Sequence, residues 1–246
     1  MNKETKFDPS EYWNKRLDNE FTLKGVGYIS FSAGYNKWLY QRKENVLLKI
    51  FKDINVAAKT NRVLDIGCGT GFFVKQYLKV NAQVAGVDIT TRSVEELTAQ
   101  FPNSTFRVLD ISSNNGSLNE TFDIINMWDV MYHIVDDAAF ARACNNISSM
   151  SKPGTYFIVT DMMAANKMIR PAEHVCFRTR KEYELTLGEK GFVLQKQYPL
   201  YRFLNRHYRW SDGITNKIAP LLCSLDNFNN TPVSNNLCVA VWKKEK

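Results

Sequence analysis

Residues 63–73, which read Val-Leu-Asp-Ile-Gly-Cys-Gly-Thr-Gly-Phe-Phe, constrain the fold of this chain more than any other stretch. They begin as a short buried strand and then turn sharply at three glycines in alternate positions. An apolar periodic segment follows at once, with Phe73, Tyr77 and Leu78 on one face of a helix. Glycine reaches backbone angles closed to other residues and lets a ligand approach the main chain. The succession of strand, glycine loop and helix therefore predicts a nucleotide-type cradle at the carboxyl end of a parallel strand.

The spacing of the glycines favours one class of nucleotide cofactor over another. A dinucleotide fingerprint requires G-x-G-x-x-G, but Phe72 stands where its third glycine would fall. An acid, Asp65, also precedes the first glycine by two positions. This pattern resembles the first motif of the class I S-adenosylmethionine (SAM) methyltransferases. The resemblance implies that SAM binds at Asp65, Gly67, Cys68, Gly69 and Gly71.

Two further acids occur where this family places cofactor contacts. Asp88 follows a predicted strand at 83–87, about 20 residues past the first glycine, where a carboxylate accepts hydrogen bonds from the ribose hydroxyls. Asp110 follows a predicted strand at 105–109, where the family recognises the adenine amino group. Two plainer interpretations stay open: Asp88 as a helix-start acid and Asp110 as a solvated loop acid. The resemblance adds three residues to the predicted cofactor site, namely Ile89, Ile111 and Trp128.

The segment 128–133 leaves a continuous apolar run at 122–127, which is typical of a strand covered on both faces. In the resembling fold, the loop after this strand carries the residues nearest the transferred methyl group. We predict His133 as a general base for a hydroxyl acceptor, with a helix-end histidine bonded to the backbone as the alternative. Asp129 and His174 are the other predicted catalytic residues.

No metal is predicted at the site. Asp129 and Asp161 both follow strands, so a magnesium site of the catechol-methylating type has to be considered. Such a site requires a further Asp or Asn directly after the second acid, and Met162 and Met163 stand there instead. Two carboxylates alone are a thin ligand set for a hard cation.

The resemblance implies an α/β fold with a Rossmann-like sheet of seven strands in the order 3-2-1-4-5-7-6, the last strand antiparallel. The expected strands are 63–66, 83–87, 105–109, 122–127, 155–160, 192–198 and 237–242. Helices are expected at 70–80, at 93–101, from a cap at Asp136 to about residue 150, and after a capping box at Thr179. Residues 152–154 are predicted as a turn and 162–177 as a loop at the acceptor edge.

We expect two regions: an N-terminal helical cap at 1–60 and a SAM-binding domain at 61–246. The domain carries an acceptor-side insertion at about 199–235, because roughly 38 residues are too many for an ordinary connection between strands. The helical pattern of the cap begins at Asn36. Its apolar face is formed by Leu39, Val46, Ile50 and Ile54. The two tyrosines of the cap, Tyr35 and Tyr40, are interpreted either as core packing or as acceptor contacts.

Composition supports one α/β domain with decorations, since 246 residues with a hydrophobic share of 44% suffice for a full core. No apolar run approaches membrane-spanning length, and residues 1–24 lack the apolar stretch of a signal peptide. Five dispersed cysteines without C-x-x-C spacing suit a reducing compartment. We therefore expect a soluble cytoplasmic protein, and the sequence makes no prediction of its oligomeric state.

The acceptor is predicted to be a small molecule, with the hydroxyl of a sugar-like or other metabolite as the first choice. The net charge of +7 invites an anionic acceptor, and Arg170, Arg202 and Arg206 are candidate anchors. The chain lacks the Asn-Pro-Pro-Tyr clamp of adenine-amino methylases and the Pro-Cys pair of common cytosine-ring enzymes. An RNA methyltransferase using the basic surface remains the alternative. A non-catalytic SAM-fold partner subunit and an NAD-binding oxidoreductase are further alternatives, which the intact glycine loop, Asp65 and Asp88 oppose.

Overall fold

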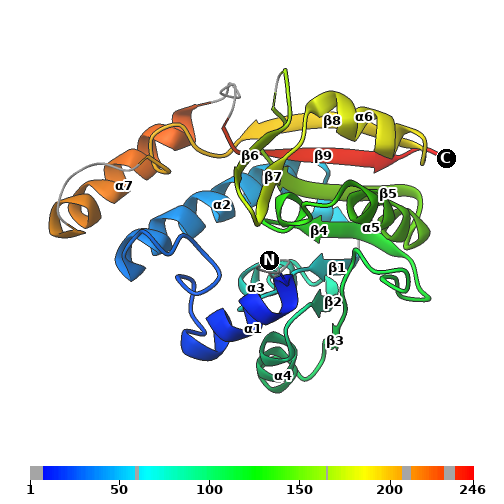
Figure 1. The fold of residues 1–246 in the computed structure, drawn as a ribbon, viewed down its shortest axis with the longest axis horizontal. Coiled ribbons are helices and arrows are strands. Elements are labelled where there is room, and N and C mark those ends of the chain that lie inside the picture. Colours follow the sequence, from blue (N-terminus) through cyan, green and yellow to red (C-terminus); the bar gives the residue numbers. More distant parts are fainter. Residues whose placement is uncertain (1–7, 59–60, 165, 207–211, 230–235) are drawn as a thin grey trace, which may run out of the picture.

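The computed structural model describes residues 8–58, 61–164, 166–206, 212–229 and 236–246. Its centre is a seven-stranded sheet in the order β3-β2-β1-β4-β5-β9-β8 (Figure 1). β1 to β5 run parallel, and β9 is antiparallel to both of its neighbours. This confirms the predicted order 3-2-1-4-5-7-6, because β6 and β7 form a separate two-stranded sheet. The strands of the main sheet are β1 (Arg62–Ile66), β2 (Gln83–Asp88), β3 (Thr105–Val108), β4 (Phe122–Met127), β5 (Ser151–Asp161), β8 (Phe192–Pro199) and β9 (Cys238–Lys244).

Helices cover both faces of the sheet, so the central strands bury alternate side chains in two separate cores. On β4, Ile124 packs into one core and Ile125 into the other. This two-sided burial accounts for the continuous apolar run of β4. The first core includes side chains of α2 (Ala33–Asp53), α3 (Phe72–Leu78) and α4 (Thr91–Gln100), and the second includes those of α5 (Asp137–Ser149) and α6 (Arg180–Gly188).

Two helices precede the first strand. α1 (Pro9–Asn19) begins after Asp8, whose carboxylate accepts hydrogen bonds from two backbone amides of the first turn. The apolar pattern does not predict this helix. α2 begins after its cap Ser32, slightly before the predicted start, and a short 3₁₀ turn at Val56–Ala58 follows it. The apolar face predicted for α2 is confirmed by the full burial of Leu39, Val46 and Ile50.

The turn predicted at 152–154 is wrong, because these residues belong to β5. The register between β4 and β5 shifts between the pairs Phe122–Ser151 and Ile124–Tyr156, so β5 bulges at this point. Gly154 has a φ of 92°, a conformation that glycine adopts without strain. The Pro-Gly pair therefore marks an irregularity inside the strand instead of the turn before it.

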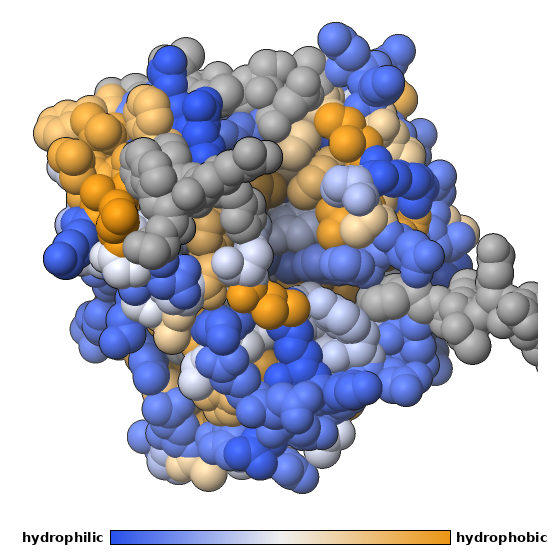
Figure 2. Space-filling model, turned by 60° about the vertical axis from the view of Figure 1, so that its left-hand side comes forward, coloured by the Kyte–Doolittle hydropathy of each residue, from blue (hydrophilic) through white to orange (hydrophobic). Residues whose placement is uncertain are grey.

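The segment 162–177, predicted as a loop, contains a short antiparallel hairpin of β6 (Ile169–Ala172) and β7 (Val175–Phe177). The described part of the expected insertion contains α7 (Asp212–Phe228), which packs against α2 (Figure 1). α7 leaves four large apolar side chains exposed: Ile214, Leu221, Leu225 and Phe228. Figure 2 turns this side of the molecule forward, and hydrophobic side chains gather at its upper left. In the described part of the chain, no helix has the length and apolar character required to cross a bilayer.

Candidate active site

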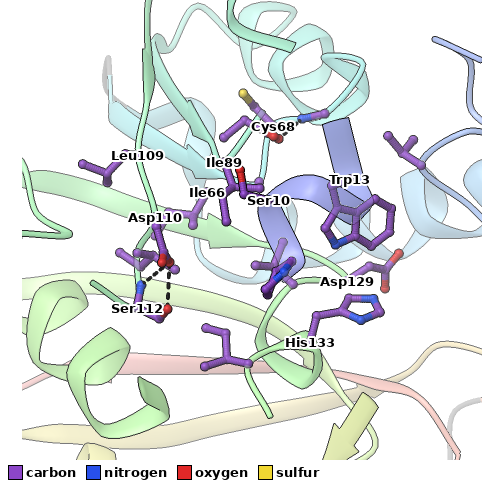
Figure 3. Close-up of a pocket in the computed structure, with 18 of the residues that line it drawn as sticks. Ser10, Trp13, Ile66, Cys68, Ile89, Leu109, Asp110, Ser112, Asp129 and His133 are labelled. Atoms are coloured by element: carbon purple, nitrogen blue, oxygen red, sulfur yellow. Dashed lines mark hydrogen bonds between the residues drawn. The ribbon is translucent and has the colours of Figure 1, made fainter. Parts of the chain in front are cut away.

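A cavity of about 560 Å³ opens at the carboxyl edge of the parallel strands, within the range of roughly 300–1,000 Å³ typical of small-ligand sites. Its walls come from α1, α2 and the start of α3, from the loops after β1 to β4 and from the start of α5. Figure 3 shows Asp110 beside Ser112 at one end, and Trp13, Asp129 and His133 together at the other. The predicted cofactor residues that line it are Gly67, Cys68, Gly69, Asp88, Ile89, Asp110, Ile111 and Trp128, whereas Asp65 and Gly71 do not border the cavity.

The glycine loop is held in a left-handed conformation that glycine adopts without strain. Gly67, Gly69 and Gly71 have φ angles of 71°, 50° and 74°. A Cβ on Gly67 would lie 2.2 Å from a methyl carbon of Val130, which belongs to the loop after β4. The amides of Gly67 and Cys68 both donate to the carbonyl of Val87 at the end of β2. The loop is therefore fixed to the sheet while its backbone faces the cavity.

Asp88 joins the glycine loop to the start of α4 through side-chain hydrogen bonds. Its Oδ2 accepts a hydrogen bond of 2.8 Å from Gly69 N, and its Oδ1 accepts bonds from the amide and hydroxyl of Thr90 at 2.9 and 2.7 Å. The helix cap of α4 is Thr90, so the simple helix-start interpretation of Asp88 does not describe its position. Burial raises the pKa of Asp88 and these hydrogen bonds oppose that effect. A carboxylate offers about four acceptor positions, so after these three bonds at most one position remains for a ribose hydroxyl at the cavity.

Asp110 lies at the opposite end of the nucleotide cradle. Its side chain is exposed, and its Oδ1 accepts hydrogen bonds from the amide and hydroxyl of Ser112 at 2.8 and 2.7 Å. These two bonds orient the carboxylate at the cavity wall between the apolar side chains of Leu109 and Ile111. The position suits recognition of an amino group on a flat base, and it is also that of a loop acid stabilised by its own turn.

Asp65 is buried behind the glycine loop. Its Oδ1 accepts a 2.6 Å bond from Asn126 Nδ2, and its Oδ2 has no hydrogen-bond partner within the described residues. The amide oxygen of Asn126 in turn accepts from Tyr77 and from the indole of Trp128. This network connects the acid of the first motif to Trp128, which stacks on Phe73 at the cavity wall.

Asp65 also makes the stability of the cofactor-free chain pH-dependent. Burial raises its pKa from 3.8 to about 7, so the folded chain binds more protons than the unfolded chain between about pH 4 and pH 7. Stability therefore falls as pH rises through this window. We expect Asp65→Asn, which stays neutral, to gain about 2–3 kcal/mol of unfolding free energy over wild type between pH 5 and pH 7.5.

Urea unfolding at the two pH values measures this gain. Asp161, whose pKa burial also raises to about 7, is present in both proteins and cancels from the comparison. If the difference in unfolding free energy between the variant and wild type does not change with pH, Asp65 is not held protonated by burial.

Asp129 occupies the other end of the cavity in a left-handed conformation, with a φ of 57°. Its amide donates a 2.8 Å bond to Thr160 Oγ1 on the neighbouring strand. Its Oδ2 forms an ion pair with Lys43 of α2, whose side chain is only 2% exposed. Oδ1 is buried without a partner of ordinary hydrogen-bond geometry in the described part of the chain. Sequence patterns did not identify Lys43 as part of the site.

His133 borders the cavity in its neutral form. Its Nδ1 lies 2.8 Å from the carbonyl oxygen of His174, and because a carbonyl only accepts, Nδ1 is the protonated nitrogen. Nε2 therefore carries a free lone pair. Burial lowers the pKa of His133 to about 4. The backbone bond of the alternative interpretation is therefore present on a residue that also lines the cavity. The role of His133 as a general base stays a prediction.

His174 does not line the cavity. Its ring lies parallel to that of His133, with the centroids 5.8 Å apart, and it stacks on Tyr12 of α1. Its carbonyl fixes the tautomer of His133. His174 therefore orients His133 through this carbonyl bond and the parallel rings, and its own ring does not reach the cavity.

The residues expected at the acceptor divide into two groups. Tyr40 lines the cavity, whereas Tyr35 is buried in the core and donates from its hydroxyl to the carbonyl of Leu204. The three candidate arginines, Arg170, Arg202 and Arg206, are exposed and do not border the cavity. His207 and Arg209, also in the insertion, lie outside the described residues.

α1 supplies the wall that sequence analysis missed. Ser10, Trp13 and Leu17 of this helix line the cavity, and the indole of Trp13 meets the ring of His133 edge-on with centroids 5.2 Å apart. The Asp8-Pro9 pair is a signal that could have located the helix, because Asp is a favoured cap and Pro a favoured first residue.

The two acids considered for magnesium have other partners. Asp129 pairs with Lys43, and Asp161 accepts a hydrogen bond from the hydroxyl of Tyr183. Within the described ranges, no three His, Cys, Asp or Glu side chains lie close enough together to hold a metal ion. Independence from metal stays a prediction.

Comparison with known proteins identifies the family. Residues 35–197, more than half of the chain, match the family described as a methyltransferase domain. A ubiquinone biosynthesis O-methyltransferase from Albidiferax ferrireducens is 26% identical over 135 residues, covering 53% of this chain and 50% of the relative. The protein of the same name from Neisseria meningitidis is 26% identical over 189 residues, covering 71% and 75%. The chain thus spans only about half the length of the first of these relatives.

Solved structures share the fold. Magnesium protoporphyrin IX methyltransferase from Synechocystis with bound SAM has a TM-score of 0.64 at 14% identity and covers 98% of this chain and 100% of its own. The N-methyltransferase NodS from Bradyrhizobium japonicum, in complex with S-adenosylhomocysteine (SAH), has a TM-score of 0.61 at 15% identity, with 97% and 100% covered. Given the family match over most of the sheet and the glycine cradle at its edge, this chain belongs to the methyltransferase-domain family of SAM-dependent enzymes.

Proposed function

We propose that this chain transfers the methyl group of SAM to a hydroxyl of a small-molecule acceptor. The observation that carries the proposal is the pairing of two proton-accepting groups at one end of the cavity. Asp129 and His133, whose Nε2 is unprotonated, both line the cavity at the end opposite Asp110. A hydroxyl acceptor needs a proton acceptor within hydrogen-bond reach, and this end provides two.

The residues around the cavity fit SAM. The left-handed backbone of Gly67 and Gly69 leaves room for close approach of the cofactor, Asp88 suits the ribose hydroxyls and Asp110 the adenine amino group. When bound, SAM supplies an electrophilic methyl group on a sulfonium. The chain itself orients the acceptor and excludes water, which can supply about 7–11 kcal/mol of barrier lowering.

The charge of the cavity wall supports a neutral acceptor over the anionic one considered from the sequence. Its lining includes no lysine or arginine within the described residues, but five acids: Asp8, Asp88, Asp110, Asp129 and Asp136. Such a wall attracts the cationic cofactor and repels a second anion. The same wall supports a small molecule over RNA, whose phosphates require Lys and Arg contacts.

Aromatic rings around Asp129 support a flat acceptor over a sugar-like one. Phe73 stacks on Trp128 with centroids 4.6 Å apart, and Phe72 meets the ring of Tyr40 edge-on at 4.8 Å. All of these side chains line the cavity together with Trp13, which lies on the same side as Asp129 in Figure 3. Tyr40 contacts the ammonium of Lys43 that pairs with Asp129. Aromatic walls with few polar groups favour a ring-shaped apolar ligand. We therefore infer a hydroxylated aromatic compound as the first acceptor class to assay.

The assay uses SAM carrying a labelled methyl group with three acceptor sets: catechols and phenols, simple sugars, and total RNA. We expect label in the phenolic set and an alkali-stable ether in the product. Asp129→Asn is the test variant, because it keeps the side-chain shape but removes the carboxylate. It should still bind SAH in calorimetry, while methyl transfer falls at least about 100-fold. Label in RNA alone, or SAH binding without transfer to any set, would overturn the proposal.

A further inference from the structure

Lys43 is an unusual residue for its position in α2. It lies in the middle of the helix among the buried apolar side chains of Leu39, Val46 and Leu47. Its side chain is 2% exposed, its ammonium pairs with Asp129 Oδ2, and the same ammonium lies 4.0 Å from the ring centroid of Tyr40. A lysine is rarely buried unless it is paired, so Asp129 accounts for its presence in the core.

Lys43 supplies the cation that is paired with Asp129. The titratable groups around this ion pair include four phenols, one imidazole and one guanidinium. Four phenols surround the pair, and burial is the main cause that raises their pKa values, so they stay neutral. His133 is neutral because burial lowers its pKa to about 4. Burial is the largest single influence and lowers the pKa of Lys43, but the attraction and hydrogen bond of Asp129, together with Tyr40 and Tyr28, raise the pKa overall. These neighbours are Arg16 from α1, Tyr28 from the loop before α2, Tyr40 from α2, Tyr132 and His133 from the turn after β4, and Tyr201 after β8.

The carboxylate of Asp129 is fixed from two directions. Thr160 holds the backbone amide on one side, and Lys43 holds Oδ2 on the other. Oδ1 is the remaining oxygen, on a residue that borders the cavity. The carboxylate is therefore fixed in place: Oδ2 is bound to the cation, Oδ1 is buried, and 18% of the side chain stays exposed on a residue that lines the cavity.

We infer that Lys43 is a positioning residue that holds the Asp129 carboxylate at the acceptor end of the cavity. This inference rests on the proposed function. In the step it supports, the O–H bond of the acceptor breaks and its electron pair stays on the acceptor oxygen. The proton forms a bond to the Asp129 carboxylate, which becomes a carboxylic acid beside the unchanged ammonium. Lys43 touches neither the proton nor the acceptor.

Carbon-13 NMR of labelled aspartate carboxyls tests the pairing without any acceptor, in the SAH complex, with Asp129→Asn to assign the signal. We expect Lys43→Met to move the titration of the Asp129 signal upward by about 1–3 pH units, the range for loss of an adjacent opposite charge. Lys43→Arg should restore it if the variant with Met folds poorly. Lys37→Met, on the exposed face of the same helix, is the matched control and should leave the signal unchanged.

Kinetics test the consequence with the acceptor found in the methyl-transfer assay. Lys43→Met should move the acid limb of kcat/KM to higher pH by the same interval, with SAH affinity within about threefold of wild type. A lysine that only fills space would lower kcat without moving the limb. An Asp129 signal that titrates identically in wild type and Lys43→Met overturns the inference. If no acceptor is found, the proposed function fails, but the NMR titration still decides on Lys43.

Discussion

Asp88→Ala is expected to weaken SAH binding by about 100-fold or more. The ribose hydroxyls lose a charged acceptor, and hydrogen bonds to charged groups contribute about 1.5–3 kcal/mol each. The loss is larger than for a simple contact residue, because Asp88 also holds Gly69 N and the cap residue Thr90 in place. Its removal leaves buried donors of the glycine loop without partners. Calorimetry with SAH measures the effect directly.

Two variants separate the causes of this loss. Asp110→Ala is the matched control, since it removes an exposed cavity-lining aspartate whose described hydrogen bonds go to Ser112 in its own turn. We expect SAH affinity to fall by about tenfold or less. Asp88→Asn keeps the side-chain volume and one acceptor oxygen, so it should lie between Asp88→Ala and wild type. SAH affinity within threefold of wild type in Asp88→Ala, or binding of NAD by the wild-type chain, would contradict the placement of the cofactor.

The features that sequence analysis predicted correctly are local in the chain. The glycine loop specifies positive φ angles that few other residues adopt, Asp88 ends β2, and Asp110 lies just beyond the end of β3. The cofactor contacts of the two acids stay predictions. The burial of β4 on both faces appears in its own residues. Each of these patterns fits within one element and the turn that follows it, so neighbouring residues suffice to predict them.

The features that it missed depend on contacts between distant residues. Lys43 and Asp129 are separated by 86 positions, and no periodicity in α2 indicates which side chain a buried lysine will meet. The carbonyl of His174 that fixes His133 belongs to a hairpin read as a loop. Both pairings arise only after the sheet has brought its loops to one edge, so they cannot be derived from spacing.

Two arginines of the insertion were expected near the acceptor, but the structure places them elsewhere. The topology allowed Arg202 and Arg206 to reach the acceptor edge, but both guanidinium groups lie near the ring of Phe203, away from the cavity. Further along the chain, α7 packs onto α2. α1, a helix with only one fully buried residue, takes the place at the cavity that was assigned to the insertion. A weakly apolar helix gives little periodic signal, although it closes the site.

The Lys43–Asp129 ion pair should also make a large contribution to the free energy of unfolding, because it joins the N-terminal helix α2 to the loop after β4. Lys43→Met leaves a carboxylate with 18% of its side chain exposed and no cation beside it, and breaking a buried pair in this way costs about 3–5 kcal/mol. Asp129→Leu in the same chain removes the unpaired charge. We therefore expect the double variant to recover most of the loss in urea unfolding, since well-packed apolar replacements of buried pairs are often neutral.

The cycle of the two single variants and the double variant isolates the coupling between the side chains. Lys37→Met controls for the loss of a positive charge on α2, and as an exposed change it should stay within about 0.5 kcal/mol of wild type. If Lys43→Met and Asp129→Leu give losses that simply add, the two side chains do not act as a pair. Recovery in the double variant should restore stability but not methyl transfer, because the proton acceptor at the cavity is gone. That separation distinguishes the pair's contribution to folding from its contribution to catalysis.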